Sequence, residues 1–325
     1  MASILQDGLI SLEDVQRARA SIGEHCLRTP VMLAQPHAPG GRSLWIKAES
    51  LQHTGSFKLR GATNAIAALG PDARAAGVVG YSAGNHGRGL ARAARLAGVA
   101  ATIVMPDAAP EAKVRGTREE GATVILRPPT ETTAHAKHLA LTLGLTVVPP
   151  DDDPHIIAGQ GTIGLELLEQ IDELDVVLVP VGGGGLISGI AVVLKRLRPQ
   201  VRVIAVEPAL AGDLAEGFAA GERKRWSRDV TGRTIADGLR STNVGDLPWV
   251  HIQALVDDVV TVSEASIVEA MRWLSDATGL AVEPSGAVAA AAVLEHAATI
   301  GDGTVAAIAT GGNIDPAVFA ALVAR

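Results

Sequence analysis

The sequence predicts an α/β fold made of two doubly wound, mostly parallel sheets. Short aliphatic runs alternate with helical patterns along almost the whole chain, which favours parallel strands joined by helices. The runs are rich in Val, Ile and Ala without apolar–polar alternation, as expected for strands that helices cover on both faces. At roughly 150 residues a domain, a chain of 325 residues suggests two domains.

The first half of the chain predicts five strands and the helices between them. Residues 11–14 (Ser-Leu-Glu-Asp) have the pattern of a capping box and open the first helix. Strands are expected at 44–47, 77–82, 101–106, 122–126 and 145–150. Later helices are expected at about 57–69, up to 96, at about 110–119 and at about 131–143.

The alternation resumes after three aspartates at 151–153. Strands are expected at 175–181, 201–208, 259–262 and 304–310. Helices are expected at about 157–171, up to 197, at about 264–277, at about 285–297 and at the C-terminal end. The expected domain seam is at 149–153, with a second crossing near 72–77. The expectation is a small domain of residues 76–150 inserted into a large domain of residues 1–75 plus 151–325.

Composition excludes several classes of protein. With 28 basic and 35 acidic residues the net charge is −7, and only eight residues are aromatic, so no nucleic-acid partner is expected. The uncharged stretch 176–194 contains Pro180 and four consecutive glycines, which fits a strand, a loop and a helix better than a membrane span. A single cysteine, Cys26, and an N-terminus without a basic signal region fit a cytoplasmic protein.

Two strand-to-helix junctions carry residues suited to chemistry. Lys58 is expected near a helix N-terminus, where the helix dipole and burial would lower its pKa and make it a nucleophile; a surface lysine is the alternative. Residues 82–87 (Ser-Ala-Gly-Asn-His-Gly) would offer backbone N–H groups to a carboxylate, with Asn85 as a further donor, unless they form an ordinary glycine turn. His86 is expected to be structural rather than a base.

A third junction consists of four glycines followed by Leu186, and it suits a phosphate at a helix N-terminus. Glu207 ends the next strand, where a Rossmann fold places its ribose-binding acid, so a nicotinamide-dependent dehydrogenase is an alternative. The G-x-G-x-x-G spacing nevertheless fails from every starting glycine. Near the C-terminus, Thr310 follows a strand and brings a hydroxyl to the carboxyl edge of the sheet, or caps a helix.

Together these motifs resemble the fold-type II pyridoxal-phosphate enzymes, within the threonine/serine dehydratase and serine racemase family. The resemblance covers about residues 11–320. It implies a fold like that of the tryptophan synthase beta chain, with pyridoxal 5′-phosphate as the cofactor. The motifs that carry it are SFKLRGA (56–62), SAGNHGRGLA (82–91), AGQGTIGLE (158–166), VPVGGGGLISG (179–189), IADGL (235–239), EPSGA (283–287) and ATGGN (309–313).

The resemblance also implies a role for individual residues. Lys58 would hold the cofactor covalently and take the substrate α-proton, and Phe57 would pack on the pyridine ring. Asn85 would donate to the ring hydroxyl, and Thr310 would pair with the ring nitrogen in place of the family's usual serine. The remaining cofactor contacts would come from Gly182, Gly183, Gly184, Gly185, Leu186, Gly238 and Glu283, and the substrate carboxylate would bind at Ser82, Ala83, Gly84, Asn85 and His86.

The implied activity is an ammonia-lyase that converts L-threonine, L-serine or a related β-hydroxy amino acid to a 2-oxo acid and ammonia. An amino-acid racemase on the same scaffold is the alternative. In serine racemases a second serine follows the residue that matches Ser82 and serves the opposite face of the substrate; this chain has Ala83 there, which favours elimination. Arg88 stands where a glutamine is common.

The resemblance further implies a divalent cation and a homodimer. Glu207, the carbonyl of Ala211 and Asp213 match metal ligands of serine racemases, and oxygen ligands of this kind suit Mg²⁺ or Ca²⁺. A solvated acidic loop is the alternative interpretation of this segment.

Overall fold

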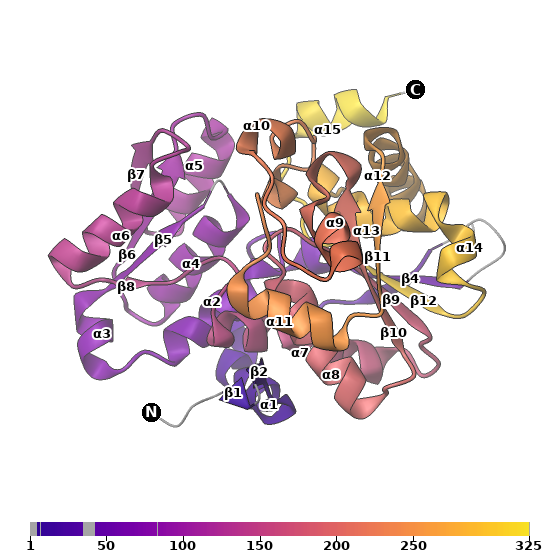
Figure 1. The fold of residues 1–325 in the computed structure, drawn as a ribbon. Coiled ribbons are helices and arrows are strands. Elements are labelled where there is room, and N and C mark those ends of the chain that lie inside the picture. Colours follow the sequence, from indigo (N-terminus) through magenta and orange to yellow (C-terminus); the bar gives the residue numbers. More distant parts are fainter. Residues whose placement is uncertain (1–4, 7, 35–42, 83, 325) are drawn as a thin grey trace.

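The computed structural model describes residues 5–6, 8–34, 43–82 and 84–324, and two parallel sheets dominate it (Figure 1). Neighbouring strands of the six-stranded sheet are parallel except for β3, which pairs antiparallel with β4 at one edge. Its order is β11 (Asp258–Val262), β10 (Arg202–Pro208), β9 (Val176–Pro180), β12 (Val305–Ile308), β4 (Leu44–Lys47) and β3 (Val31–Leu33).

The second sheet has four strands, all parallel, and lies on the left of Figure 1. Its order is β7 (Thr123–Arg127), β6 (Ala101–Pro106), β5 (Val78–Tyr81) and β8 (Thr146–Val147). Two short strands, β1 (Leu5–Gln6) and β2 (Leu9–Ile10), form a separate antiparallel pair. The predicted fold class, an α/β protein with two mostly parallel sheets, is therefore confirmed.

Helices connect the strands throughout. In the first half they are α1 (Leu12–Ile22), α2 (Lys58–Ala67), α3 (Pro71–Ala76), α4 (Asn85–Leu96), α5 (Glu111–Glu119) and α6 (Thr132–Leu143). In the second half they are α7 (Pro154–Gln170), α8 (Gly185–Leu197), α9 (Asp213–Ala220), α10 (Arg228–Thr231), α11 (Asp246–Leu255), α12 (Glu264–Thr278), α13 (Pro284–Glu295), α14 (Ala297–Ile300) and α15 (Pro316–Val323). Four short 3₁₀ turns are η1 (Gly23–His25), η2 (Glu49–Leu51), η3 (Ala209–Ala211) and η4 (Asp237–Leu239).

The start of α1 has the predicted capping box. The Ser11 hydroxyl accepts from the Asp14 amide at 3.2 Å, and the Asp14 carboxylate accepts from the Ser11 amide at 2.8 Å. No expected element corresponds to β1, β2, β3, α3, α9, α10, α11 or α14. The expected helix at about 57–69 ends before Pro71, but Pro71 also begins helix α3, because proline fits the first position of a helix well.

The central strands are buried on both faces, which explains their continuous aliphatic runs. On β10, Val203 and Ala205 pack with Ile190 of α8 in one hydrophobic cluster, whereas Ile204 and Val206 pack in another cluster with the alanines of α13. Figure 1 shows α7 and α8 on one side of the six-stranded sheet and α12 and α13 on the other. A strand in this position has no solvent face, so no polar residue interrupts its aliphatic run.

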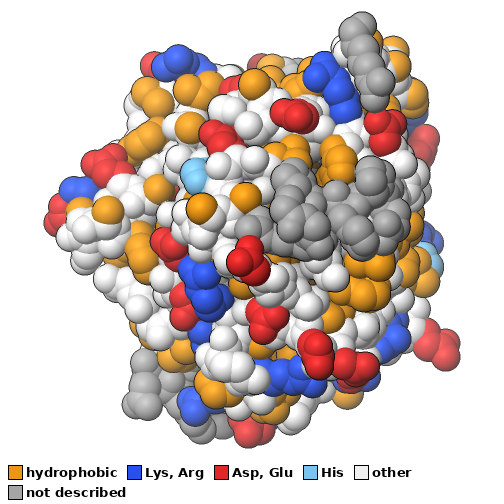
Figure 2. All heavy atoms as spheres, turned by 90° about the vertical axis from the view of Figure 1, so that its right-hand side faces the viewer, with side chains coloured by type: hydrophobic (Ala, Val, Ile, Leu, Met, Phe, Trp, Pro, Cys, Tyr) orange, Lys and Arg blue, Asp and Glu red, His pale blue; other side chains and the backbone are white. Residues whose placement is uncertain are grey.

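The face seen in Figure 2 carries acidic and basic side chains interspersed with hydrophobic ones. No single-sign charged patch dominates this face, in keeping with the modest net charge of −7. Among the described residues, no helix is long and apolar enough to cross a membrane.

Candidate active site

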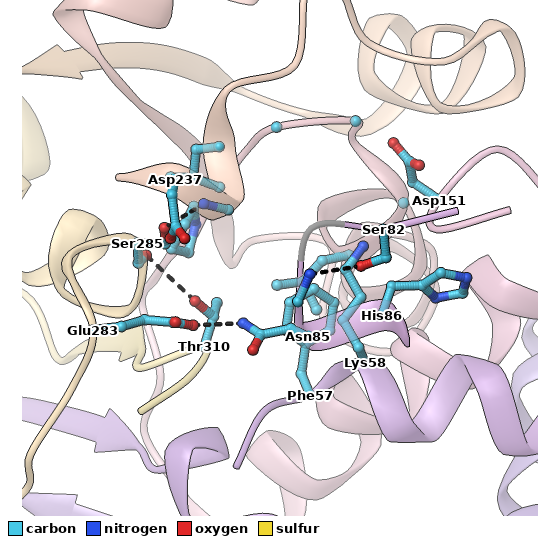
Figure 3. A pocket seen from close by; sticks show the side chains of 18 of the residues that line it. Phe57, Lys58, Ser82, Asn85, His86, Asp151, Asp237, Glu283, Ser285 and Thr310 are labelled. Carbon is cyan, nitrogen blue, oxygen red and sulfur yellow. Dashed lines mark hydrogen bonds between the residues drawn. The ribbon is translucent and has the colours of Figure 1, made fainter. Parts of the chain in front are cut away.

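A cavity lies where the carboxyl ends of strands from both sheets come together (Figure 3). Its walls come from the segments after β5, β8, β9 and β12, from the starts of α2 and α4, and from η4. In parallel sheets, this edge is where ligands bind. The lining residues are Phe57, Lys58, Ser82, Gly84, Asn85, His86, Lys113, Asp151, Pro180, Gly182, Gly183, Gly184, Gly185, Leu186, Asp237, Gly238, Leu239, Glu283, Ser285 and Thr310.

Lys58 is the first residue of α2, in agreement with its expected place near a helix N-terminus. Its Nζ donates to the Pro150 carbonyl at 2.6 Å and lies 5.1 Å from the centre of the Phe57 ring. Burial lowers the pKa of Lys58, and the nearby carboxylate of Asp151 only partly opposes this. The amine is therefore easier to deprotonate than an exposed lysine, as a nucleophile or base requires.

An ion network underneath holds α2 in place. Arg60 is fully buried and binds Glu49 at 2.8 Å and Glu166 of α7 at 2.6 Å. Lys47 at the end of β4 also binds Glu166, at 2.5 Å. Every charge in this network has an opposite partner, as buried charges need, and the network fixes the helix that carries Lys58.

The four glycines after β9 form a narrow backbone cradle. Gly184 has a φ of +91°, which other residues adopt only with strain, and α8 begins at Gly185. A Cβ added at Gly185 would lie 2.7 Å from the carbonyl oxygen of Asp151, and one added at Gly183 would collide with the Asp151 carboxylate. Only glycine fits here, and the N-terminus of α8 faces the cavity, so the loop suits an anionic phosphate.

Asn85 and Glu283 contact each other across the cavity (Figure 3). The Asn85 Nδ2 donates to Glu283 Oε1 at 2.5 Å, and Asn85 Oδ1 accepts from Asn313 at 2.8 Å. Arg88 in turn donates to Asn313 at 3.0 Å, so the arginine that replaces the common glutamine joins this chain of hydrogen bonds. Burial raises the pKa of Glu283 to about 7.

Thr310 follows β12 and lines the cavity. Its hydroxyl donates to the Ser285 carbonyl at 3.3 Å, and the Ser285 hydroxyl accepts from the Gly238 amide at 2.9 Å. The backbone of Thr310 also accepts from the Phe57 amide at 3.1 Å, which ties the end of β12 to the lysine segment. Thus the predicted positions Phe57, Gly238 and Thr310 lie together.

The segment after β5 forms another wall. Ser82 accepts from the Gly84 amide at 3.0 Å, while Ala83 lies outside the described residues. His86 is buried, and its Nε2 donates to the Val148 carbonyl at 2.9 Å. Burial lowers the pKa of His86 to about 3, so the imidazole is neutral and a poor proton acceptor at neutral pH.

The three residues expected to hold a metal follow the glycine loop in the sequence and lie within one short segment. Glu207 ends β10, Ala211 lies in η3, and Asp213 begins α9. Glu207 accepts from the Leu214 and Ala215 amides at 3.2 and 2.8 Å, whereas Asp213 Oδ2 is buried without a hydrogen-bond partner in the described part of the chain. Burial raises the pKa of both carboxyl groups, that of Asp213 to about 7. Two buried acids and an unpartnered oxygen fit a cation ligand set.

Six lining residues are not among the predicted site residues: Lys113, Asp151, Pro180, Asp237, Leu239 and Ser285. Lys113 on α5 forms an ion pair with Asp237 on η4, and both residues line the cavity. Asp237 and Ser285 belong to the quoted motifs IADGL and EPSGA, which offer a signal. Asp151 and Lys113 lie outside every motif, and only the fold brings them to the cavity.

Comparison with known proteins agrees with this geometry. The family of pyridoxal-phosphate dependent enzymes matches residues 22–311. A serine racemase of Arabidopsis thaliana is 42% identical over 309 residues, covering 93% of this chain and 92% of the relative. An L-threonine ammonia-lyase of Thermotoga maritima is 41% identical over 312 residues, covering 94% of this chain and 76% of the relative.

Two solved structures also resemble the chain along nearly its whole length. A threonine deaminase of the organism T.th. has a TM-score of 0.88 at 40% identity, covering 94% of this chain and 99% of that one. A maize serine racemase has a TM-score of 0.88 at 37% identity, covering 95% of each chain.

The fold and the cavity thus define an enzyme of the fold-type II class. The chain belongs to the pyridoxal-phosphate dependent enzymes, and the predicted resemblance and cofactor are confirmed. The matched range includes the glycine loop, so the dehydrogenase alternative has no support.

Proposed function

We propose that this enzyme is an ammonia-lyase that converts L-threonine, L-serine or a related β-hydroxy amino acid to a 2-oxo acid and ammonia. The observation that carries the proposal is the Lys58 amine, which is held at the cavity wall with a lowered pKa. A base for the substrate α-proton must be near its target and uncharged at working pH. Lys58 lines the cavity, and burial lowers its pKa, so its amine loses its proton more readily than that of an exposed lysine.

The residues around Lys58 fit pyridoxal phosphate. Gly182, Gly183, Gly184, Gly185 and Leu186 would hold its phosphate at the start of α8, as the narrow backbone cradle supports. Phe57, Gly238 and Glu283 would surround its ring, with Asn85 and Thr310 as polar partners. When bound, the cofactor supplies an electron sink for the carbanion left by loss of the α-proton.

The substrate carboxylate would bind at residues 82–86, of which Ser82, Gly84, Asn85 and His86 line the cavity together with Lys58. Lys58 would then take the α-proton from one face of the substrate. Because Ala83 offers no hydroxyl to the opposite face, the β-hydroxyl would leave in preference to reprotonation there. An amino-acid racemase is the second candidate, since the Arabidopsis relative at 42% identity is a serine racemase.

Release of 2-oxo acid across a panel of β-hydroxy amino acids tests the proposal. We expect L-threonine, L-serine or a related compound to yield 2-oxo acid and ammonia in equal amounts. Chiral chromatography of the same incubations measures racemisation. If D-serine forms as fast as pyruvate, the lyase proposal is wrong and the racemase proposal takes its place.

Further features belong to the same proposal. Glu207, Ala211 and Asp213 would hold Mg²⁺ or Ca²⁺, supported by the unpartnered Asp213 oxygen. The division into residues 1–75 plus 151–325 and residues 76–150 is supported by the four-stranded sheet, whose strands all lie between 78 and 147. A homodimer and a cytoplasmic location are proposed from the family resemblance and from the buried, unpaired Cys26.

A further inference from the structure

One acidic residue lies where the proposed function places an anion. The Asp151 side chain extends from the segment after β8 into the cavity, next to the glycine loop (Figure 3). A Cβ added at Gly183 would collide with its carboxylate, and one added at Gly185 would lie 2.7 Å from its carbonyl oxygen. The carboxylate therefore belongs to the wall of the phosphate cradle itself.

A phosphate bound in the glycine loop and the Asp151 carboxylate would repel each other, because both are negatively charged. A phosphate monoester carries about −1.5 to −2 charges at neutral pH, because its second pKa is near 6. The start of α8 offers roughly half a positive charge, which offsets only part of this. When two acidic groups share one site, the pair keeps a proton that each would lose alone.

The surroundings of Asp151 do not remove this repulsion. Lys58 is the cation that acts on the Asp151 carboxyl, and its own pKa is lowered by burial. His86 on α4 is neutral, Tyr81 on β5 is a phenol, and Asp152 on the same segment adds a further negative charge. Burial raises the pKa of the Asp151 carboxyl even before an anion arrives.

We propose that Asp151 is a cofactor-binding residue that shares one proton with the cofactor phosphate, so that the site binds a phosphate ester together with a proton. The inference rests on the proposed function only in that a phosphate ester occupies the glycine loop. It does not depend on whether the enzyme eliminates or racemises.

Proton uptake on binding measures this sharing directly. Pyridoxine 5′-phosphate is the probe, because it has the phosphate and the ring but no aldehyde to react with a lysine. The cofactor-free full chain carrying Lys58→Ala is the background, since the lysine then exchanges no proton. Calorimetry in buffers of different ionisation enthalpy, from about pH 7 to about pH 9.5, gives the number of protons bound with the probe.

We expect the Lys58→Ala protein to take up close to one proton more than the Lys58→Ala, Asp151→Asn protein at the alkaline end. As the pH rises, the affinity of the Lys58→Ala protein for pyridoxine 5′-phosphate should then fall up to about tenfold more per pH unit than that of the double variant. Asp152→Asn, in the same background, removes the neighbouring carboxylate, which caps α11, and should keep the extra proton. Asp151→Ser serves as a second variant if the asparagine protein does not fold.

Equal proton uptake with and without the Asp151 carboxyl over the whole pH range would overturn the inference while leaving the proposed function intact. Failure of pyridoxine 5′-phosphate to bind the cofactor-free wild-type chain would overturn the phosphate site, and with it both proposals.

Discussion

Asn85 at the start of α4 and Glu283 immediately before α13 are joined by a hydrogen bond of 2.5 Å, Nδ2 to Oε1. The two residues are 198 positions apart in the sequence and come from helices that pack on different sheets. The second Glu283 oxygen is buried without a partner among the described residues. This pair therefore connects the two halves of the cavity with a carboxyl group that is costly to ionise.

The raised pKa of Glu283 predicts a pH-dependent stability. Its pKa is about 7 in the folded protein against 4.5 ordinarily, so the folded state holds a proton that the unfolded state has lost. The stability from this group is complete below pH 4.5 and is lost as the pH rises to about 7. Relative to Glu283→Gln, the wild type should lose up to about 3 kcal/mol over this range.

Denaturant unfolding of the cofactor-free proteins at several pH values measures this difference. Glutamine keeps an acceptor for Asn85 but cannot titrate. Parallel stability curves for wild type and variant between pH 4.5 and 7 would show that Glu283 has an ordinary pKa.

Lys58→Ala should abolish turnover and leave the fold intact. Lys58 is proposed both to hold the cofactor and to accept the α-proton, whereas the other lining lysine, Lys113, forms an ion pair with Asp237. The α2 helix should survive because the Arg60 network underneath remains. Assays of 2-oxo acid release and thermal melting check the two halves of the prediction.

Lys195→Ala is the matched control, because Lys195 pairs with Asp257 outside the cavity lining. The control should keep its turnover. Substantial activity in Lys58→Ala would refute the assignment of Lys58.

Mg²⁺ or Ca²⁺ should raise the melting temperature, and EDTA should lower it. A ligand that binds only the folded state stabilises it by about 2.7 kcal/mol at roughly a hundred times its dissociation constant. Asp213→Ala should erase the difference, whereas Glu216→Ala, an exposed acid on the same helix, should preserve it. If neither metal nor EDTA changes the wild type, the metal site does not exist.

Ala83→Ser should raise racemisation relative to elimination. A serine hydroxyl can exchange a proton with the face of the substrate opposite Lys58, which alanine cannot do. Ala83→Gly, which also lacks a hydroxyl, should leave the ratio unchanged. Chiral chromatography and pyruvate assays of L-serine incubations give the two rates, and an unchanged ratio in the serine variant would count against the opposite-face argument.

The sequence predicts those features that local patterns determine. Strand β4 coincides with the expected 44–47, and α2 begins at Lys58, because aliphatic runs and glycine punctuation act over a few residues. The prediction fails for β3, which has only three residues and pairs as an antiparallel edge.

Features built from distant residues cannot be predicted in the same way. Arg60 meets Glu166 only after α2 and α7 pack together, and both residues lie in quoted motifs without an assigned role. Asp151 belongs to the expected domain seam, yet the crossing from β8 to α7 carries it to the glycine loop. Its importance is a consequence of tertiary structure and not of spacing.

The most direct test of the account is to locate the cofactor on the chain. The purified wild-type protein should be yellow and should lose that absorption on treatment with borohydride, which reduces the bond between a lysine and the cofactor. Mass spectrometry of the reduced protein should then find the cofactor on the peptide that contains Lys58. A colourless protein that gains no absorption with added pyridoxal phosphate, or a cofactor attached to another lysine, would contradict the account.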